Sequence, residues 1–353
     1  MNIKGKIVLS NSVIDGFITI KDGFITYVGE TAPQGDMIDY GDNFITPGLI
    51  DIHCHSSLLE SARDNPEAVA DFHLAHGVTS MLLTFYKDTP HEKLLDCLSK
   101  IRSLIKTKRN VLGAHLEGPY INSSLGYDDG KKIQNLPEKD KYESYILSGV
   151  IKQWTFAPEL DGVIPVIKRA SEYGIIPSIG HSKASYDQVK SAYDNGAKIV
   201  THIFDATGYT DNSEFKGTKD LTFDQACMLM DDMYYEVICD GEWVHVRKQM
   251  LDLLIKTVGI DKVVAITDLD ISDAIDDGRD IAVVDGQLAG TKLTMDIVCR
   301  NLFRAGYSVH DIFKMTSKNP ASALNLADRG QIKEGLIADL CLFDKDMNFI
   351  KVI

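Results

Sequence analysis

The 353-residue sequence lacks three features that would each assign it to a broad class of proteins. Its six cysteines are scattered with no CxxC pair, so we expect buried thiols rather than disulfides. No apolar run approaches the ~18–20 residues that a membrane-spanning helix needs, and Met1–Lys6 contains no apolar signal core. The formal charge of −14 provides no basic footprint for nucleic acid or for an anionic membrane. We therefore expect a cytoplasmic protein that acts on a small molecule and binds neither nucleic acid nor membranes.

What the sequence does contain is a regular alternation of strand-like and helical stretches. Eight strand-like runs are each followed by a helical stretch of about 10–16 residues, the pattern of βα units in a parallel sheet. The expected strands are Leu49–His55, Val78–Phe85, Val111–Glu117, Gln153–Ala157, Ile175–His181, Ile199–Phe204, Tyr235–Cys239 and Val263–Asp268. Eight such units close into a barrel. We predict an α/β protein with a (β/α)8 TIM-like barrel.

The two ends of the chain have a different pattern from the barrel segment. Residues 1–46 hold short strand-like runs separated by turn signals, and turn-and-strand character returns over residues 331–343. We predict that both termini form one small β-sandwich domain, residues 1–47 and 327–353, beside a metal-dependent hydrolase barrel over residues 48–326.

Imidazoles and carboxylates lie at the carboxyl ends of the predicted barrel strands, where a barrel holds its catalytic groups. His53 and His55 are two residues apart on one strand, so both point to the same side and can reach one ion. Together with Glu117, His181 and His202 they suit a divalent metal, with Zn²⁺ favoured and Fe²⁺, Mn²⁺ and Co²⁺ as alternatives. Either one ion is bound, or two ions share Glu117 as a bridge.

Two further residues accompany these candidate ligands. Asp268 ends the last predicted strand, where it could accept a proton from metal-bound water and pass it to a leaving amine. The alternative is that Asp268 caps the next loop. His115, two residues before Glu117, shares the inward face and could orient Glu117 or contact substrate. We predict that Asp268 is catalytic.

The motifs that contain these residues resemble those of the amidohydrolase superfamily, and within it the family of N-acetylglucosamine-6-phosphate deacetylases. They are Pro47–His55, His115–Pro119, Gly180–Ser182, Thr201-His202 and Thr267-Asp268. The resemblance implies a metal-dependent hydrolase on a distorted barrel with a flanking β-domain, commonly a homodimer. It also implies that Glu117, His181 and His202 are the principal ligands, that His53 and His55 are the extra pair of two-metal members, and that Asp268 is the general base and then the acid.

The substrate-binding positions depart from this family's pattern. Asp205-Ala206 replaces an Asn-Ala pair that helps to hold the sugar phosphate, and a carboxylate there would repel a dianion. The arginine expected in the next loop is missing from residues 208–220. Trp243 stands where the family has a substrate-contacting histidine, and the nearest histidine, His245, comes two places later. We expect an intact metal site, a rebuilt phosphate clamp, and weak or absent activity on the phosphate ester.

Substrate contacts are accordingly predicted for His115, Asp205, Ala206 and Trp243. Trp243 could form a stacking wall for the substrate, or it could pack beneath the barrel rim. Several carboxylates would make the pocket mouth acidic and favour neutral or cationic ligands, unless they form only a solvated loop surface. They are Asp205, Asp211, Glu214, Asp270 and Asp273.

The sequence therefore predicts an enzyme that hydrolyses a carbon–nitrogen bond. We expect attack of metal-bound hydroxide on an N-acetylated amino sugar or a related N-acyl compound. Alternatives on the same metal core are cyclic-amide, dipeptide or deaminase activity. A protein of another class, a catalytically idle metal-binding homologue, would have no use for a proton shuttle at Asp268.

Overall fold

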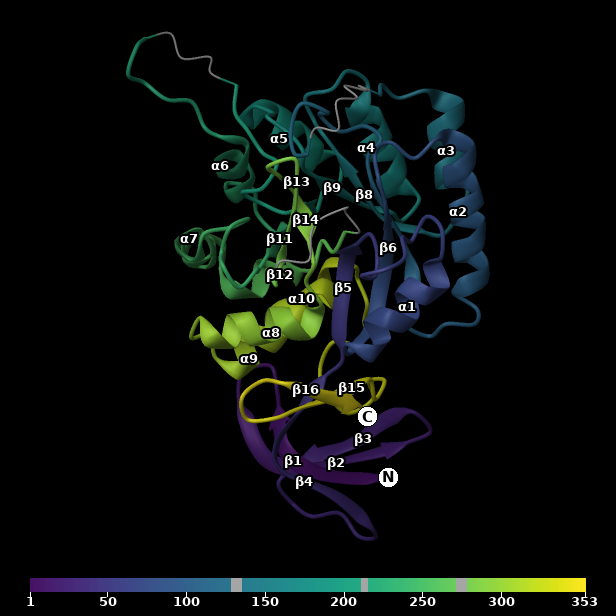
Figure 1. Ribbon diagram of the computed structural model, residues 1–353, viewed down its shortest axis with the longest axis vertical. Coiled ribbons are helices and arrows are strands. Elements are labelled where there is room, and N and C mark those ends of the chain that lie inside the picture. Colours follow the sequence, from purple (N-terminus) through teal and green to yellow (C-terminus); the bar gives the residue numbers. More distant parts are fainter. Residues whose placement is uncertain (128–134, 211–214, 271–277) are drawn as a thin grey trace.

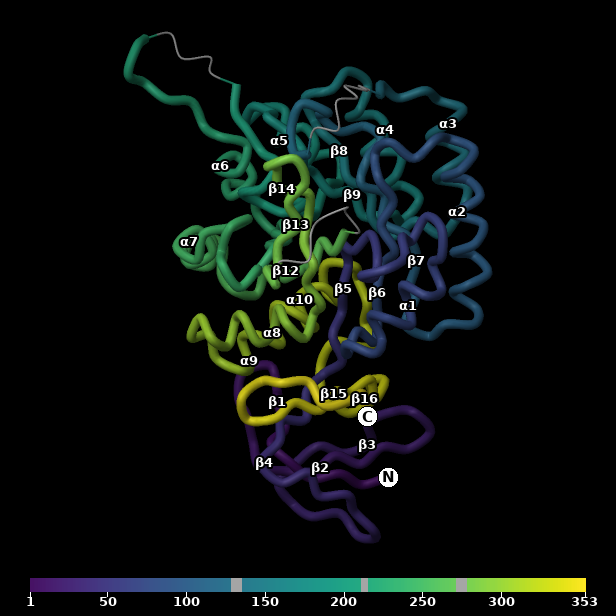
Figure 2. The backbone as a smooth tube through the Cα atoms, viewed as in Figure 1, coloured from purple at the N-terminus to yellow at the C-terminus, as the bar shows by residue number. Residues whose placement is uncertain are grey.

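The computed structural model of the protein describes residues 1–127, 135–210, 215–270 and 278–353. Figure 1 shows a large unit of strands and helices above a smaller sheet, at which both chain termini lie. The yellow C-terminal segment lies against the purple N-terminal strands (Figure 2). Each helix within the described residues is too short or too polar to cross a membrane.

The large unit is built on a parallel sheet of eight strands that are adjacent in chain order. The strands are β5 (Leu49–Cys54), β6 (Val78–Phe85), β7 (Val111–Glu117), β8 (Ile151–Phe156), β9 (Ile176–Ile179), β10 (Ile199–Val200), β11 (Tyr234–Ile238) and β12 (Val263–Ile266). They are almost entirely buried, as expected for a parallel sheet covered on both faces. The predicted eight-stranded barrel is confirmed, although β10 is shorter than expected because the backbone turns at His202, whose φ is 27°.

Helices connect the strands and cover the outside of the barrel (Figure 1). They are α1 (Pro66–Ala75), α2 (His91–Leu104), α3 (Lys139–Ile146), α4 (Val163–Glu172), α5 (Tyr186–Asp194), α6 (Phe223–Met228), α7 (Lys248–Val258) and α8 (Met295–Arg304). In α2, Leu94, Leu98 and Ile101 recur at helical spacing and are buried, so one face of the helix packs on the barrel. A hairpin, β13 (Ile281–Val284) and β14 (Gln287–Thr291), precedes α8, and α9 (Val309–Phe313) and α10 (Asn319–Ala323) follow it.

The barrel closes between its first and last strands just beyond the end of β12. The backbone N–H of Asp268 donates to the carbonyl of His53 at 3.0 Å, and the N–H of His55 donates to the carbonyl of Leu269 at 2.9 Å. Below them, the hydroxyl of Thr267 donates to the fully buried carboxylate of Asp51 at 2.6 Å. This closure places Asp268 beside His53 and His55.

The expected small β-domain takes the form of one continuous six-stranded sheet. Its order is β16-β15-β4-β1-β2-β3, formed by β1 (Asn2–Val8), β2 (Val13–Lys21), β3 (Phe24–Gly29), β4 (Met37–Pro47), β15 (Leu340–Phe343) and β16 (Phe349–Val352). Gly48 alone separates β4 from β5, and a Cβ there would lie 2.1 Å from the Thr79 hydroxyl, so only glycine fits. The exact division at residues 47 and 327 stays a prediction.

The buried His73 on α1 should make stability depend on pH. Its Nε2–H donates to the Ser56 carbonyl at 2.9 Å, and burial lowers its pKa to about 4. The unfolded chain takes up a proton near pH 6.5 and the folded chain does not, so stability present above that pH is lost as pH falls toward 4. Between pH 7 and 5, the wild-type free energy of unfolding should fall by about 2 kcal/mol more than that of His73→Gln.

Denaturant unfolding at the two pH values measures this difference. His310→Gln, at a less buried histidine on α9, is the matched control and should keep the wild-type pH dependence. Equal pH slopes for the wild type and His73→Gln would contradict the prediction.

Candidate active site

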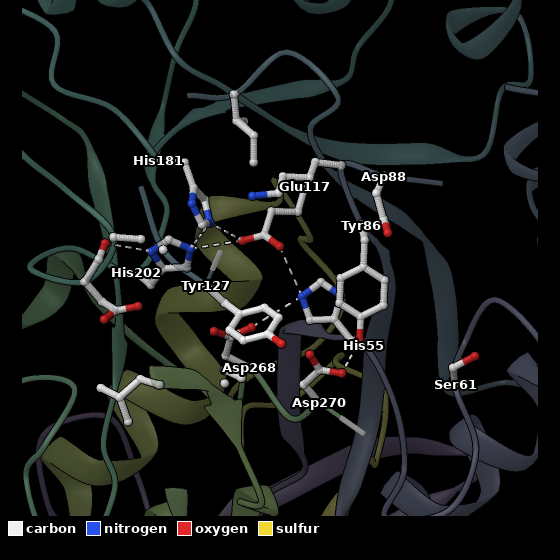
Figure 3. Close-up of a pocket in the computed structure, with 18 of the residues that line it drawn as sticks. His55, Ser61, Tyr86, Asp88, Glu117, Tyr127, His181, His202, Asp268 and Asp270 are labelled. Carbon is white, nitrogen blue, oxygen red and sulfur yellow. Dashed lines mark hydrogen bonds and ion pairs between the residues drawn. The ribbon is translucent and has the colours of Figure 1, made fainter. Parts of the chain in front are cut away.

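Six side chains reach one point at the carboxyl ends of the barrel strands, and Figure 3 shows five of them, His55, Glu117, His181, His202 and Asp268. His53 and His55 lie on β5, and Glu117 is the last residue of β7. The other three each lie two residues beyond a strand and have left-handed φ angles, namely His181 (44°), His202 (27°) and Asp268 (47°). Such angles are unfavourable for residues with a Cβ, so the surrounding fold must stabilise them. They end each strand abruptly and turn the side chain toward the cluster.

Glu117 is at the centre of the cluster. Its Oε1 lies 2.9 Å from Nε2 of both His181 and His202, and its Oε2 lies 3.2 Å from Nε2 of His55. Nε2 of His53 is 3.5 Å from Oε1 of Glu117. Asp268 Oδ1 lies 3.3 Å from His53 Nε2 and 3.4 Å from His55 Nε2. All six predicted residues are therefore brought together.

The outer nitrogens of three of these histidines fix the ring orientations. Nδ1 of His53 donates to the buried carboxylate of Glu236 at 3.1 Å, and Nδ1 of His202 donates to the Asp205 carbonyl at 3.1 Å. Nδ1 of His181 donates to the Leu125 carbonyl at 3.4 Å. Because Nδ1 carries the proton in each ring, the Nε2 lone pairs point at one another, with His181 and His202 only 3.0 Å apart. This convergence of lone pairs suits a bound cation.

The donor set fits one or two divalent ions. His53, His55 and Glu117 form one group with ligand atoms close enough to share an ion, and Glu117, His181 and His202 form another. Burial would raise the pKa of Glu117, but the charges of His181 and His53 hold it well below its usual range. Burial lowers the pKa of His202, but hydrogen bonding to Glu117 raises it to about 10, so its Nε2 favours a proton at the place where a bound metal ion would replace it. The cluster therefore attracts positive charge.

His115 does not contact the cavity, which corrects its predicted role in substrate binding. Its ring is fully buried behind His53, with the ring centroids 4.5 Å apart. Its Nε2 lies 2.8 Å from the Thr155 hydroxyl and its Nδ1 lies 3.2 Å from the Thr84 hydroxyl. Two residues along a strand correspond to roughly 6.5 Å, so His115 lies one layer below Glu117. It packs beneath a candidate ligand instead of facing the substrate.

A cavity of about 760 Å³ opens above the cluster. Asp205 and Ala206 line it, as predicted for substrate contacts, and so does Asp270. Trp243 lines a separate hollow beside Lys248 and packs partly against the core, which favours the packing alternative, and its contact with substrate stays a prediction. Of the remaining carboxylates predicted at the mouth, Asp211, Glu214 and Asp273 lie outside the described residues.

Sequence reasoning missed Tyr86 and two cations on the cavity wall. The ring of Tyr86 stacks on His55 with centroids 4.0 Å apart, and its hydroxyl donates to Asp270. Arg63 and Lys87 also line the cavity. Tyr86 and Lys87 directly follow the end of β6, so a search for polar residues just beyond every barrel strand would have found them.

His245 also faces the cavity, from the loop after β11. Asp240 is fully buried and accepts backbone N–H groups from Glu242, Val244 and His245, which fixes the loop. Asp240 also lies 3.2 Å from Nδ1 of His245. Among the described residues Nε2 of His245 has no hydrogen-bond partner, although the side chain is only 1% exposed.

The sequence matches the profile of the amidohydrolase family over residues 44–353, most of its length. The chain belongs to the amidohydrolase family. Two relatives of this amidohydrolase are the N-acetylglucosamine-6-phosphate deacetylases of Lysinibacillus sphaericus and Bacillus subtilis, each 28% identical to it. The matches cover 94% and 98% of this chain, and 89% and 93% of the relatives.

A solved structure agrees with these sequence matches. The N-acetylglucosamine-6-phosphate deacetylase of Thermotoga maritima has a TM-score of 0.84 and 27% identity to this amidohydrolase. The match covers 100% of this chain and 98% of that one, so both sheets have counterparts in the relative.

Replacing Glu236 by Gln should weaken metal binding. Glu236 accepts hydrogen bonds from His53 Nδ1 at 3.1 Å and from Gln153 at 2.6 Å, and a glutamine has only one oxygen for these two donors. We expect roughly 10–100-fold weaker affinity for Zn²⁺, measured by competition with a chelator. Glu172→Gln, on the outer helix α4, should bind as the wild type does. Unchanged affinity in Glu236→Gln would show that this hydrogen bond does not support a metal ligand.

Proposed function

We propose that this amidohydrolase is a metal-dependent deacetylase that removes the acetyl group from an N-acetylated amino sugar or a related N-acyl compound. The observation that carries the proposal is the position of Asp268. Its carboxylate touches His53 and His55 and also lines the cavity above the cluster. The names of the two relatives, which match over nearly their full length, support the same reaction class.

The chain's own residues supply the binding and proton-transfer steps. Glu117, His53, His55, His181 and His202 would hold the metal, which when bound provides a water of lowered pKa and polarises the amide carbonyl. Burial would raise the pKa of Asp268, but the charge of His53 and the hydrogen bond from His55 keep it well below its usual range. Asp268 is therefore ionised and can accept a proton, then donate it to the nitrogen of the departing amine.

Several finer points belong to this proposal. Zn²⁺ is the favoured metal because imidazole and carboxylate ligands suit it, with Fe²⁺, Mn²⁺ and Co²⁺ as alternatives. We also infer a homodimer in the cytoplasm, which rests on the family resemblance and on the composition. The barrel over residues 48–326 would carry the whole site.

The proposed substrate is not the phosphate ester that names the relatives. Asp205 lines the cavity, where a carboxylate disfavours a dianion. The cavity's two cationic side chains, Arg63 and Lys87, are accompanied in its lining by Asp64 and Asp88, which directly follow them in the chain. A phosphate needs an arginine fork or a similar unopposed donor set to bind well.

Asp268→Asn tests the proposed proton transfer. Asparagine has the same size but cannot take up the proton, so we expect metal content to stay near the wild-type level and kcat to fall by about 10²–10⁴-fold. Metal analysis and acetate release measure the two quantities. Asp232→Asn, at an exposed surface ion pair with Lys262, is the control for the loss of one carboxylate and should keep full activity. Turnover by Asp268→Asn near the wild-type rate would rule out this role.

Metal removal combined with a substrate comparison tests the reaction itself. Chelation should abolish release of acetate from N-acetylglucosamine, and added Zn²⁺ should restore it, because the metal activates the water. N-acetylglucosamine-6-phosphate should be hydrolysed with a kcat/KM at least about tenfold lower, since the walls repel the dianion. Efficient turnover of the phosphate ester would contradict the proposed substrate preference. Activity that survives complete removal of metal would contradict the proposed metal dependence.

A further inference from the structure

We propose that the cavity selects N-acetylated amino compounds that carry a second, protonated amine, and that Asp270 is the residue that binds this ammonium group. The inference rests on the proposed deacetylase function and goes beyond it by naming the charge of the substrate. It assigns a specificity role to Tyr86 as the residue that positions Asp270.

Asp270 is held rigidly beside the catalytic cluster. Its backbone N–H donates to the Thr291 carbonyl at 3.1 Å, and a Cβ on Gly290 would lie 2.9 Å from the Asp270 Cβ, so β14 packs directly behind it. The Tyr86 hydroxyl donates to its Oδ1, and the Tyr86 ring is fixed by stacking on His55. Figure 3 shows Asp270 next to His55 and Tyr86, on the side of the cluster away from His181 and His202. The carboxylate is therefore placed for a ligand in the cavity.

The cavity walls favour a cation at this position. Outside the metal cluster, the described lining has two cationic side chains, Arg63 and Lys87, and a larger number of carboxylates. These carboxylates are Glu60, Asp64, Asp88, Asp205 and Asp270. Glu117 and Asp268 offset the charge of a bound metal, so the remaining walls keep a negative balance. A concave surface of one sign concentrates ligands of the opposite sign.

His245 provides a second, independent sign of a polar ligand. Its Nε2 has no hydrogen-bond partner among the described residues, its side chain is 1% exposed, and it lines the same cavity. A buried polar atom without a partner is unfavourable, so a ligand that satisfies it gains affinity. A sugar hydroxyl can donate to or accept from an imidazole nitrogen in either protonation state. An N-acetylated sugar with a free amine therefore offers an ammonium group to Asp270 and a hydroxyl to Nε2 of His245.

Three N-acetylated sugars that differ only at carbon 6 test the proposal on the wild-type enzyme loaded with Zn²⁺. The parent is N-acetylglucosamine with its 6-hydroxyl, and the others carry a protonated 6-amine or a 6-phosphate. We expect kcat/KM to be about tenfold higher for the amine than for the hydroxyl, and lowest for the phosphate, because a charge-assisted hydrogen bond is stronger than a neutral one.

Asp270→Asn identifies the residue responsible. The asparagine oxygen can still accept from Tyr86, so the wall keeps its shape, and the amine-to-hydroxyl ratio of kcat/KM should fall about tenfold. Asp42→Asn removes one charge from an exposed carboxylate on the small sheet and should leave the ratio unchanged. If Asp270→Asn does not fold, the order of kcat/KM for the three sugars on the wild-type enzyme still decides whether the cavity prefers the amine.

The possible failures are distinguishable. Equal kcat/KM values for the three sugars, or a preference for the phosphate, would overturn this inference while leaving the deacetylase function intact. An unchanged ratio in folded Asp270→Asn would overturn the role of Asp270. If none of the sugars is hydrolysed, the deacetylase function fails, and the inference that rests on it fails too.

Discussion

The structure depends on the burial of the Glu117 carboxylate among four imidazole rings. Nε2 of each ring lies within 3.5 Å of a Glu117 oxygen. Lone pairs on these nitrogens would repel the carboxylate, so the cluster is unfavourable without a cation or protons between them. The fold maintains it through the left-handed backbone at His181 and His202 and through Glu236, which fixes His53 from behind. The barrel therefore holds a preorganised ligand set instead of one assembled when the metal arrives.

Much of this architecture was accessible from the sequence, for identifiable reasons. Strands of a parallel barrel are buried on both sides, so their sequences are continuous apolar runs. The residues at their carboxyl ends all lie at the same face of the barrel. That is why Glu117, His181, His202 and Asp268 could be grouped without coordinates. His115 was misjudged because strand alternation reports which face a residue lies on but not how deep it lies. Trp243 and Tyr86 depend on loop backbone angles, which hydrophobic periodicity does not encode.

The metal centre and the cavity walls follow different constraints in this protein. The ligands come from strand ends, whose positions the barrel closure between β5 and β12 fixes. The walls come from the loops that follow these strands, where Asp205, His245 and Asp270 lie. Loops accept substitutions more readily than buried strands do. The cavity walls can therefore change while the candidate ligand set at the strand ends is kept.

Gly48 connects the small sheet directly to the first strand of the barrel. β4 continues into β5 through this one residue, and the neighbour of β4 on its second edge is β15, from the last part of the sequence. The Gly48 N–H itself donates to the Asp339 carbonyl at 2.7 Å. The base of the strand that bears His53 and His55 is held by β6, where the Leu49 N–H donates to the Gly77 carbonyl at 3.1 Å, and also by this contact with Asp339. The position of two candidate metal ligands is thereby tied to a segment that lies far from them in the chain.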